Sequence, residues 1–173
     1  MIKNIGVDFV IDINETIKTL CRKYSAFSGR VQHDVSALGE NFATLTMPNE
    51  KNPKFPMTVM LYEKGYALVS IGNCGEALRC ESESALIETV QNILADKVYF
   101  TLQYKSEADF DVCRVCASRI DTDEGEYEKY IASLEKKVTF FEKLLGGNTG
   151  IFEVTDFGGA AYRVIRRGIK ERN

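Results

Sequence analysis

A pair of cysteines separated by two residues, Cys113 and Cys116, is the motif in this chain with the clearest link to chemistry. Two such pairs together are typical of a zinc site, and one pair at a helix start after a strand is typical of a thiol redox centre. The sequence holds no second pair, and its one histidine, His33, lies far away in the chain. We therefore expect buried thiols here, and we predict no metal and no cofactor.

Cys74 is a second candidate, as a nucleophile in a glycine-flanked loop after a strand. A cysteine nucleophile needs a base close by, and His33 is the only imidazole that the chain offers. Nothing in the sequence places the two together, so His33 is expected to be an ordinary strand or surface residue. We favour a non-catalytic protein and keep a small thiol-dependent enzyme as an alternative.

The triplet Asp156-Phe157-Gly158 matches the metal-binding triplet of protein kinases. The chain has no glycine-rich loop ahead of the triplet and no catalytic-loop motif, and it is too short for a kinase domain. Aspartate and glycine are both common in hairpin turns. We therefore interpret the triplet as the turn of a closing hairpin.

The chain closes with a basic segment, which bears on nucleic-acid binding. Basic residues beside an aromatic strand face can bind single-stranded nucleic acid, and Tyr99 lies on such a predicted strand face. The candidate contact residues are Tyr99, Arg163, Arg166, Arg167 and Lys170. The net charge of −3 disfavours such binding. We expect a solvated terminal strand with a short basic tail at about 168–173, and keep nucleic-acid association as an alternative.

A stripe of apolar residues, spaced alternately four and three apart, predicts the strongest helix of the chain. Its members are Tyr127, Ile131, Leu134, Val138, Phe141 and Leu145. This is the pattern of a helix laid along another helix. Phe140 and Leu144 widen the apolar face beyond what a coiled coil needs, so packing on a sheet is the commoner explanation. The stripe is nevertheless our candidate protein interface.

Two strands, Met57–Tyr62 and Tyr66–Ile71, carry the densest apolar pattern, and Glu63-Lys64-Gly65 is the tight turn between them. Glycine suits the left-handed position that closes such a hairpin. Both strands are mostly apolar on both faces, whereas a half-exposed strand alternates apolar with polar residues. We therefore expect cover on both sides, with the Tyr127–Leu145 helix as the best candidate for one. The other cover is expected to be the Ile13–Tyr24 helix or a second subunit.

The remaining segments predict a mixture of helices and antiparallel strands. Asp12 and either Ser82 or Ser84 are expected helix caps, and Gly29 is the expected stop of the first helix. The strand Val98–Tyr104 is expected to have one buried and one solvated face, with Tyr99, Thr101 and Gln103 on the solvated one. Segment 106–120 is ambiguous between helix and edge strand. Further strands are expected at Asn4–Ile11, Gly29–Val35, Asn41–Met47, Ile151–Thr155 and Ala160–Arg167.

Length and composition bound the class of protein. At 173 residues the chain suits one domain of roughly 100–200 residues, and no apolar run approaches the ~20 residues that span a membrane. Its five irregularly spaced cysteines favour reduced thiols in the cytoplasm. We predict one α+β domain over residues 1–173, with a mainly antiparallel sheet and about three helices. We expect a cytoplasmic, non-catalytic protein-binding or adaptor and chaperone-like module that forms a homodimer through its apolar surfaces.

Overall fold

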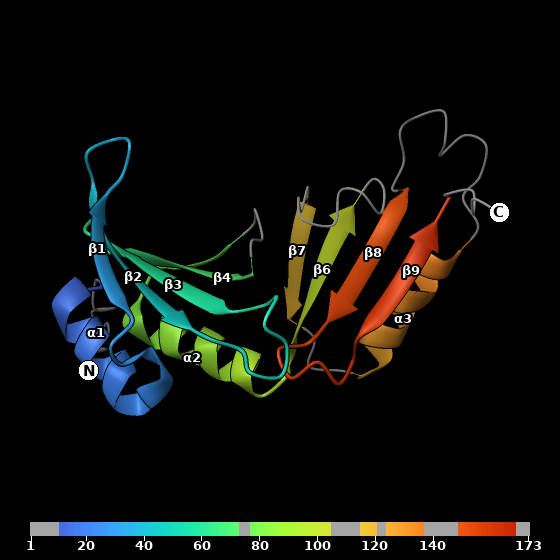
Figure 1. Cartoon of the computed structure of the whole chain (residues 1–173), viewed down its shortest axis with the longest axis horizontal. Helices are drawn as coiled ribbons and strands as arrows, with labels where there is room; N and C mark the ends of the chain where they lie inside the picture. Colours follow the sequence, from blue (N-terminus) through green and yellow to red (C-terminus); the bar gives the residue numbers. More distant parts are fainter. Residues whose placement is uncertain (1–10, 73–76, 105–114, 121–123, 137–148, 169–173) are drawn as a thin grey trace, which may run out of the picture.

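The computed structural model describes residues 11–72, 77–104, 115–120, 124–136 and 149–168. The chain has an α+β fold with two antiparallel sheets that lie side by side (Figure 1). Sheet A has the strand order β1-β2-β3-β4-β5, and sheet B has the order β7-β6-β8-β9. The predicted fold class is confirmed. The division of the strands between two sheets was not apparent from the sequence.

Sheet A is built from strands that pair in the order in which they follow one another in the chain. Its strands are β1 (Val31–Val35), β2 (Asn41–Met47), β3 (Met57–Tyr62), β4 (Tyr66–Ile71) and β5 (Leu78–Cys80). The predicted hairpin of β3 and β4 is confirmed, and Gly65 at its turn has a φ of 87°. That left-handed conformation is easily adopted by glycine and brings Tyr62 opposite Tyr66.

Helices α1 (Ile13–Lys23) and α2 (Glu83–Leu94) cover one face of sheet A, which we call its inner face (Figure 1). Both predicted caps are confirmed: Asp12 Oδ1 accepts a hydrogen bond from Glu15 N at 2.9 Å, and Ser82 Oγ accepts one from Ala85 N at 3.2 Å. Helix α1 ends earlier than its expected stop at Gly29. The chain becomes extended at Tyr24 and then forms a 3-10 turn at Ser25–Phe27.

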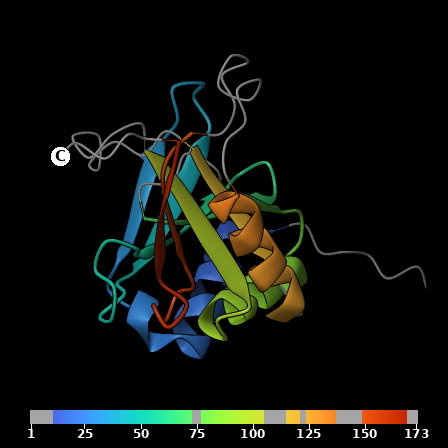
Figure 2. The same cartoon turned by 90° about the vertical axis from the view of Figure 1, so that its right-hand side faces the viewer.

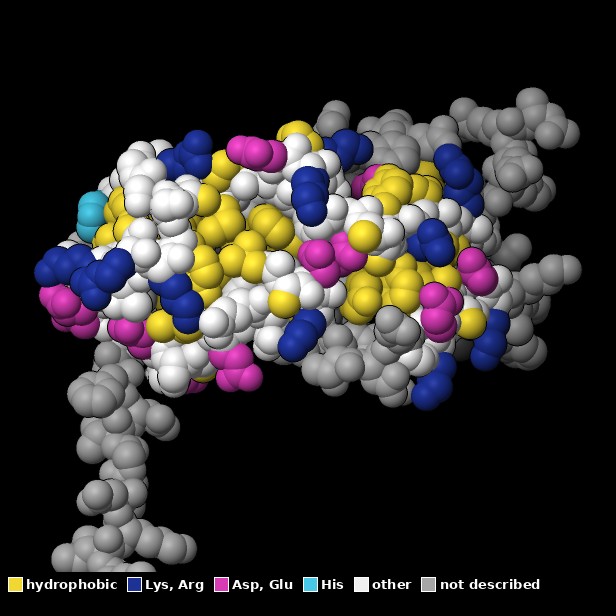
Figure 3. Space-filling model, turned by 90° about the horizontal axis from the view of Figure 1, so that it is seen from below, with side chains coloured by type: hydrophobic (Ala, Val, Ile, Leu, Met, Phe, Trp, Pro, Cys, Tyr) yellow, Lys and Arg dark blue, Asp and Glu magenta, His cyan; other side chains and the backbone are white. Residues whose placement is uncertain are grey.

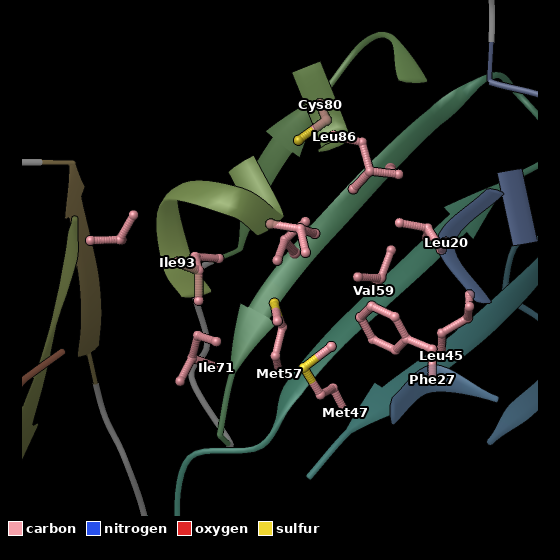
Figure 4. Packing of buried hydrophobic residues seen from close by; sticks show 14 of the residues in the cluster. Leu20, Phe27, Leu45, Met47, Met57, Val59, Ile71, Cys80, Leu86 and Ile93 are labelled. Carbon is pink, nitrogen blue, oxygen red and sulfur yellow. The ribbon is translucent and has the colours of Figure 1, made fainter. Parts of the chain in front are cut away.

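The inner face of sheet A forms the main hydrophobic core with these two helices (Figure 4). Leu45, Val59 and Leu61 are fully buried from the sheet side, and Leu20 and Leu86 from the helix side. The same core continues into sheet B. Its members there are Val98, Phe100, Leu102 and Ile151. One hydrophobic core therefore joins the two sheets.

Within the part of the chain that the structure describes, helices cover only one face of β3 and β4, and the prediction that the Tyr127–Leu145 helix covers one of their faces is wrong. Side chains along both strands alternate between buried and half-buried. Helices α1 and α2 account for the buried face. No described helix lies over the other, outer face, because the predicted helix that begins at Tyr127 packs on sheet B instead.

Sheet B is assembled from strands far apart in the chain. Its strands are β6 (Val98–Tyr104), β7 (Val115–Ile120), β8 (Gly150–Thr155) and β9 (Arg163–Arg167), with helix α3 (Glu124–Glu135) between β7 and β8. In the ambiguous segment 106–120, residues 115–120 are an edge strand, and residues 106–114 lie outside the described residues. The same holds for most of the strand predicted at Asn4–Ile11.

Helix α3 packs on the face of sheet B that points away from the shared core (Figures 1 and 2). The second core consists of Tyr127, Ile131, Leu134, Phe152, Val154 and Ile165. This packing makes the predicted solvated face of β6 wrong. Thr101 is only 6% exposed, and Tyr130 Oη donates a hydrogen bond to its Oγ1 at 2.9 Å.

The turn between β8 and β9 of sheet B forms hydrogen bonds to two segments outside that sheet. Asn49, in the loop between β2 and β3, donates a hydrogen bond from Nδ2 to the carbonyl of Phe157 at 2.6 Å. Gly158 N donates to Asp96 Oδ1 at 2.6 Å. Asp156 Oδ2 accepts from Ala161 N at 3.1 Å within the same turn. The hairpin-turn interpretation of Asp156-Phe157-Gly158 agrees with these bonds.

Candidate functional site

Three aromatic rings stand in a row on the outer face of sheet A. Phe42, Tyr62 and Tyr66 come from β2, β3 and β4 and are direct neighbours in the strand register. The Phe42 and Tyr62 ring centroids are 5.4 Å apart, and those of Tyr62 and Tyr66 are 4.6 Å apart with planes 9° from parallel. The Arg79 guanidinium lies 4.0 Å from the centroid of the Tyr66 ring. We call Phe42, Tyr62 and Tyr66 the aromatic ladder.

Strand alternation and one turn explain why these rings meet. Successive side chains of a strand point to opposite faces, so the core residues of β2, β3 and β4 leave the ladder positions outside. Next to the ladder, the register aligns Thr44, Met60 and Leu68 in a second row. All six side chains are half-buried. The outer face is therefore apolar at its centre and within reach of a partner.

Charged groups of both signs surround the ladder. Lys64 Nζ lies 3.2 Å from Glu40 Oε2, and Asn41 Nδ2 donates to Glu63 Oε2 at 2.7 Å. Burial raises the pKa of Tyr62, and Tyr66 and Glu40 raise it further. Its hydroxyl therefore stays uncharged at neutral pH and offers hydrogen bonds. An apolar centre with a polar rim is the usual anatomy of a protein–protein interface.

A buried carboxylate, Glu153 on β8, is the most unusual polar group of sheet B. It is only 2% exposed, accepts a hydrogen bond from Tyr162 Oη at 2.5 Å, and has Lys54 Nζ at 4.0 Å. Burial, with the hydrogen bond to Glu153, raises the pKa of Tyr162 to about 12. The phenol therefore stays protonated and holds the carboxylate.

The thiols predicted as chemical candidates are only partly within the described residues. Cys116 lies on β7 with its backbone opposite Leu102, whereas Cys74 and Cys113 lie outside the described residues. His33 is an exposed residue of β1. Burial raises the pKa of the Cys80 thiol, which makes it a poor nucleophile. Within the described residues, no three or more metal-binding side chains come together as a metal site.

The apolar stripe chosen as a candidate interface is engaged within the chain over its first half. Tyr127, Ile131 and Leu134 are 7%, 5% and 4% exposed because they pack on sheet B. This is the sheet packing that the wide apolar face had suggested. The other three stripe residues, Val138, Phe141 and Leu145, lie outside the described residues.

The residues predicted to contact nucleic acid do not form one surface in the described chain. The Tyr99 ring is stacked on Tyr127 beneath α3, with centroids 4.2 Å apart. The register places Arg163 and Arg167 on the α3 side of β9 and Arg166 on the opposite side. Lys170 lies outside the described residues.

The side of the molecule that carries α1 and α2 shows hydrophobic side chains in two groups, with acidic side chains between them (Figure 3). Charges thus interrupt the apolar surface on this side. None of the described helices is long and apolar enough to cross a bilayer.

The sequence analysis did not predict that the three rings of the aromatic ladder lie together. The alternation of strand residues places Tyr62 on the same face as Met60, but the sequence does not show which residues lie beside it on the neighbouring strands. The available signal was the tight turn at Gly65, which fixes Tyr62 opposite Tyr66. Comparisons with protein-family models, curated proteins and solved structures found no match for this chain.

Proposed function

We propose that this chain is a cytoplasmic, non-catalytic protein-binding module of adaptor or chaperone-like type, and that its partner docks on the outer face of sheet A. The single observation that carries the proposal is the aromatic ladder on a sheet face with no described helix above it. Aromatic and methionine side chains are enriched at protein interfaces, and aromatic residues supply much of their binding energy. The free thiols of Cys21 and Cys80 support a reducing compartment.

The ionic surroundings of the ladder favour a protein over nucleic acid. Lys64 pairs with Glu40 and Arg79 with Glu81. A third acidic residue, Glu63, accepts a hydrogen bond from Asn41. Binding to nucleic acid depends on an excess of positive charge, which this rim does not have. A partner with mixed charge around an apolar centre matches it better.

The size of the outer face sets what the partner can be. Strands about 4.8 Å apart and side chains about 3.4 Å along each strand give this face roughly 400 Å². A standard protein–protein interface uses about 800 Å² on each partner. The outer face of one copy is therefore large enough to bind a peptide-sized segment or to form a weak contact. The outer faces of a homodimer together have the area that one partner uses in a standard interface.

Paired charge substitutions test the proposal. The test variant, Tyr62→Lys with Leu68→Lys, places two charges on the outer face. The control, Glu128→Lys with Ser133→Lys, places two on exposed positions of α3. Each purified chain is immobilised and exposed to extract from the cell that makes it, and captured proteins are identified by mass spectrometry. We expect one set of proteins to be captured by wild type and control and lost with the test variant; retention by the test variant would contradict the proposal.

A further inference from the structure

Strand β1 forms a free edge of sheet A. Among the strands that the structure describes, it is the outermost of sheet A, and β2 alone pairs with it (Figure 1). Val31 is half-buried and the other four residues of the strand are exposed. Val35 is 56% exposed, and Leu38, in the turn that follows, is 90% exposed. The edge therefore offers apolar side chains as well as backbone.

The hydrogen bonds between β1 and β2 show which backbone groups face outward. Ser36 N donates to the carbonyl of Glu40 at 2.8 Å, and Thr46 N donates to the carbonyl of Arg30 at 3.3 Å. In an antiparallel pair, alternate residues exchange both bonds with the partner strand. Positions 30, 32, 34 and 36 thus bond to β2, and Val31, His33 and Val35 direct their N–H and C=O groups to the free edge.

Strand β1 lacks the protection that the edge strands β5 and β9 have. Natural edges are protected by short length, by charged residues, by proline or by bulges. The opposite edge of sheet A, β5, has only three residues, and β9 carries Arg163, Arg166 and Arg167 in its five. Strand β1 has one charged residue, Asp34, and no proline.

We propose that β1 pairs antiparallel with β1 of a second copy of this chain, about a two-fold axis at His33. This inference rests on the proposed function, because it names one protein partner and the surface that it uses. A register centred on His33 uses the whole strand. It places Val31 of each copy opposite Val35 of the other, and Gln32 opposite Asp34.

The side-chain pairs of this register are complementary to themselves. The Gln32 amide can donate to the Asp34 carboxylate of the other copy on the outer face, and this pair occurs twice. On the inner face, Val35 gains an apolar neighbour in Val31 and loses its exposure. Like charges would face one another at Asp34 only if the register shifted, which disfavours the shifted pairings.

One local hydrogen bond adjusts the strength of the contact. Asp34 Oδ1 accepts from Val35 N at 2.7 Å and so occupies one outward backbone donor. The backbone N–H and C=O groups of His33 and the N–H of Val31 do not take part in this hydrogen bond. When Asp34 turns to Gln32 of the other copy, Val35 N is released to the carbonyl of Val31 across the edge. The side-chain pair and the backbone pair therefore form together.

Pairing at β1 would double the proposed docking surface. Sheet A of one copy and sheet A of the other become one continuous sheet. The aromatic ladders of the two copies then lie on the same side of it. The combined face of roughly 800 Å² matches the area that a standard interface uses on one partner. A partner with two binding segments would also gain avidity.

Cross-linking tests the register. Gln32 and Asp34 of the other copy form a pair that does not exchange backbone bonds, with Cα atoms about 4.5 Å apart, which a disulfide can bridge. Two copies of residue 32 lie more than ~7 Å apart in this register, which is beyond disulfide reach. We therefore expect that full-length Gln32→Cys and Asp34→Cys, mixed and mildly oxidised, form a covalent dimer, whereas each variant alone stays at the wild-type level.

Size exclusion with light scattering tests the edge itself. Wild type is expected at about twice 19.5 kDa. His33→Pro removes an outward N–H and leaves the bonds to β2, since an edge strand tolerates proline on its solvent side. We expect it to raise the dimer dissociation constant at least about tenfold. Val35→Lys serves as a second variant should His33→Pro misfold, which circular dichroism reports.

The outcomes separate this inference from the proposed function. A monomeric wild type, or a dimer unchanged by both edge variants, would overturn the β1 pairing. Protein capture that depends on Tyr62 and Leu68 would still support the docking face in that case. If wild type is a dimer, the edge variants are monomers, and wild type captures no protein from the extract, the β1 pairing would be supported and the proposed docking face would have no partner.

Discussion

The two sheets of this chain differ in what lies on the face turned away from the shared core. On sheet B, α3 covers that face, and the Tyr99 and Tyr127 rings stack strand against helix. On sheet A, the Phe42, Tyr62 and Tyr66 rings stack strand against strand, and no described helix lies over them. The same kind of side chain closes a core in one place and lines a surface in the other.

The path of the chain explains this difference. After β5 the chain enters α2 on the inner side of sheet A, where the core already lies. After β7 it enters α3 on the side of sheet B away from that core. Within the described residues, sheet B is therefore covered by α3 on the face turned away from the shared core, and sheet A keeps an open outer face and an open edge at β1. Substitutions on sheet B should cost stability, whereas those on the open face should chiefly cost binding.

The largest expected contrast is between one phenylalanine of each sheet. Phe152 is 3% exposed beneath α3, so Phe152→Ala should lower the free energy of unfolding by about 3–5 kcal/mol through the lost contacts and the cavity. Phe42→Ala on the open face should lower it by only about 1–2 kcal/mol, from partial burial and one ring stack. Urea denaturation of both variants measures the difference. Equal losses would contradict the comparison.

A glycine pair gives a smaller contrast. A Cβ on Gly158 would lie 2.5 Å from Asp96 Oδ2, so Gly158→Ala should displace that carboxylate and cost about 2 kcal/mol. Gly39, in the β1–β2 turn, has a φ of 78° and open space around it, so Gly39→Ala should cost about 1 kcal/mol from backbone strain alone. Thermal unfolding compares the two. If Asp96→Ala fails to relieve the effect of Gly158→Ala, the steric explanation is wrong.

The smallest contrast is between two tyrosine hydroxyls. Tyr162→Phe removes the donor to buried Glu153 and should cost about 1 kcal/mol, a value reduced for the exposed part of the ring. The Tyr62 hydroxyl has a weak contact with Met60 Sδ at 3.8 Å, so Tyr62→Phe should cost less than about 0.5 kcal/mol. Denaturant titration at pH 7 distinguishes them. Equal effects would remove the distinction between the two regions.

The pH dependence of Tyr162 follows from its pKa of about 12. Tyrosine in an unfolded chain has a pKa near 10, so folding favours the protonated phenol. Its contribution to stability is complete below pH ~10 and is lost as the pH rises toward 12. Absorbance titration at 295 nm should show a tyrosine component near pH 12 that is absent from Tyr162→Phe. Persistence of this component in the variant would mean that another residue causes it.

Local signals predicted local structure well in this chain. Asp12, Ser82 and Gly65 each act on backbone groups within a few residues, so helix starts and the β3–β4 hairpin could be inferred directly. The short strand β5, with three residues, has too little pattern to be recognised. Caps and turns do not depend on the rest of the fold, which is why they could be predicted.

Distant pairings explain what could not be predicted. Strand β6 pairs with β8, so that Tyr104 lies opposite Ile151, and nothing near either strand indicates this. The apolar stripe from Tyr127 predicted a helix with an apolar face but not which sheet would receive it. The prediction that Thr101 is exposed to solvent was wrong for the same reason. The aromatic ladder likewise needed the register of three strands.

Site-specific photo-cross-linking tests the central claim, that the open face of sheet A binds protein, most directly. A photoreactive phenylalanine analogue replaces Met60 on that face in one chain and exposed Ser133 on α3 in another, and both are expressed in the cell that makes the protein. We predict a discrete protein adduct from position 60 and none from position 133. No adduct from position 60, or the same adducts from both positions, would contradict the claim.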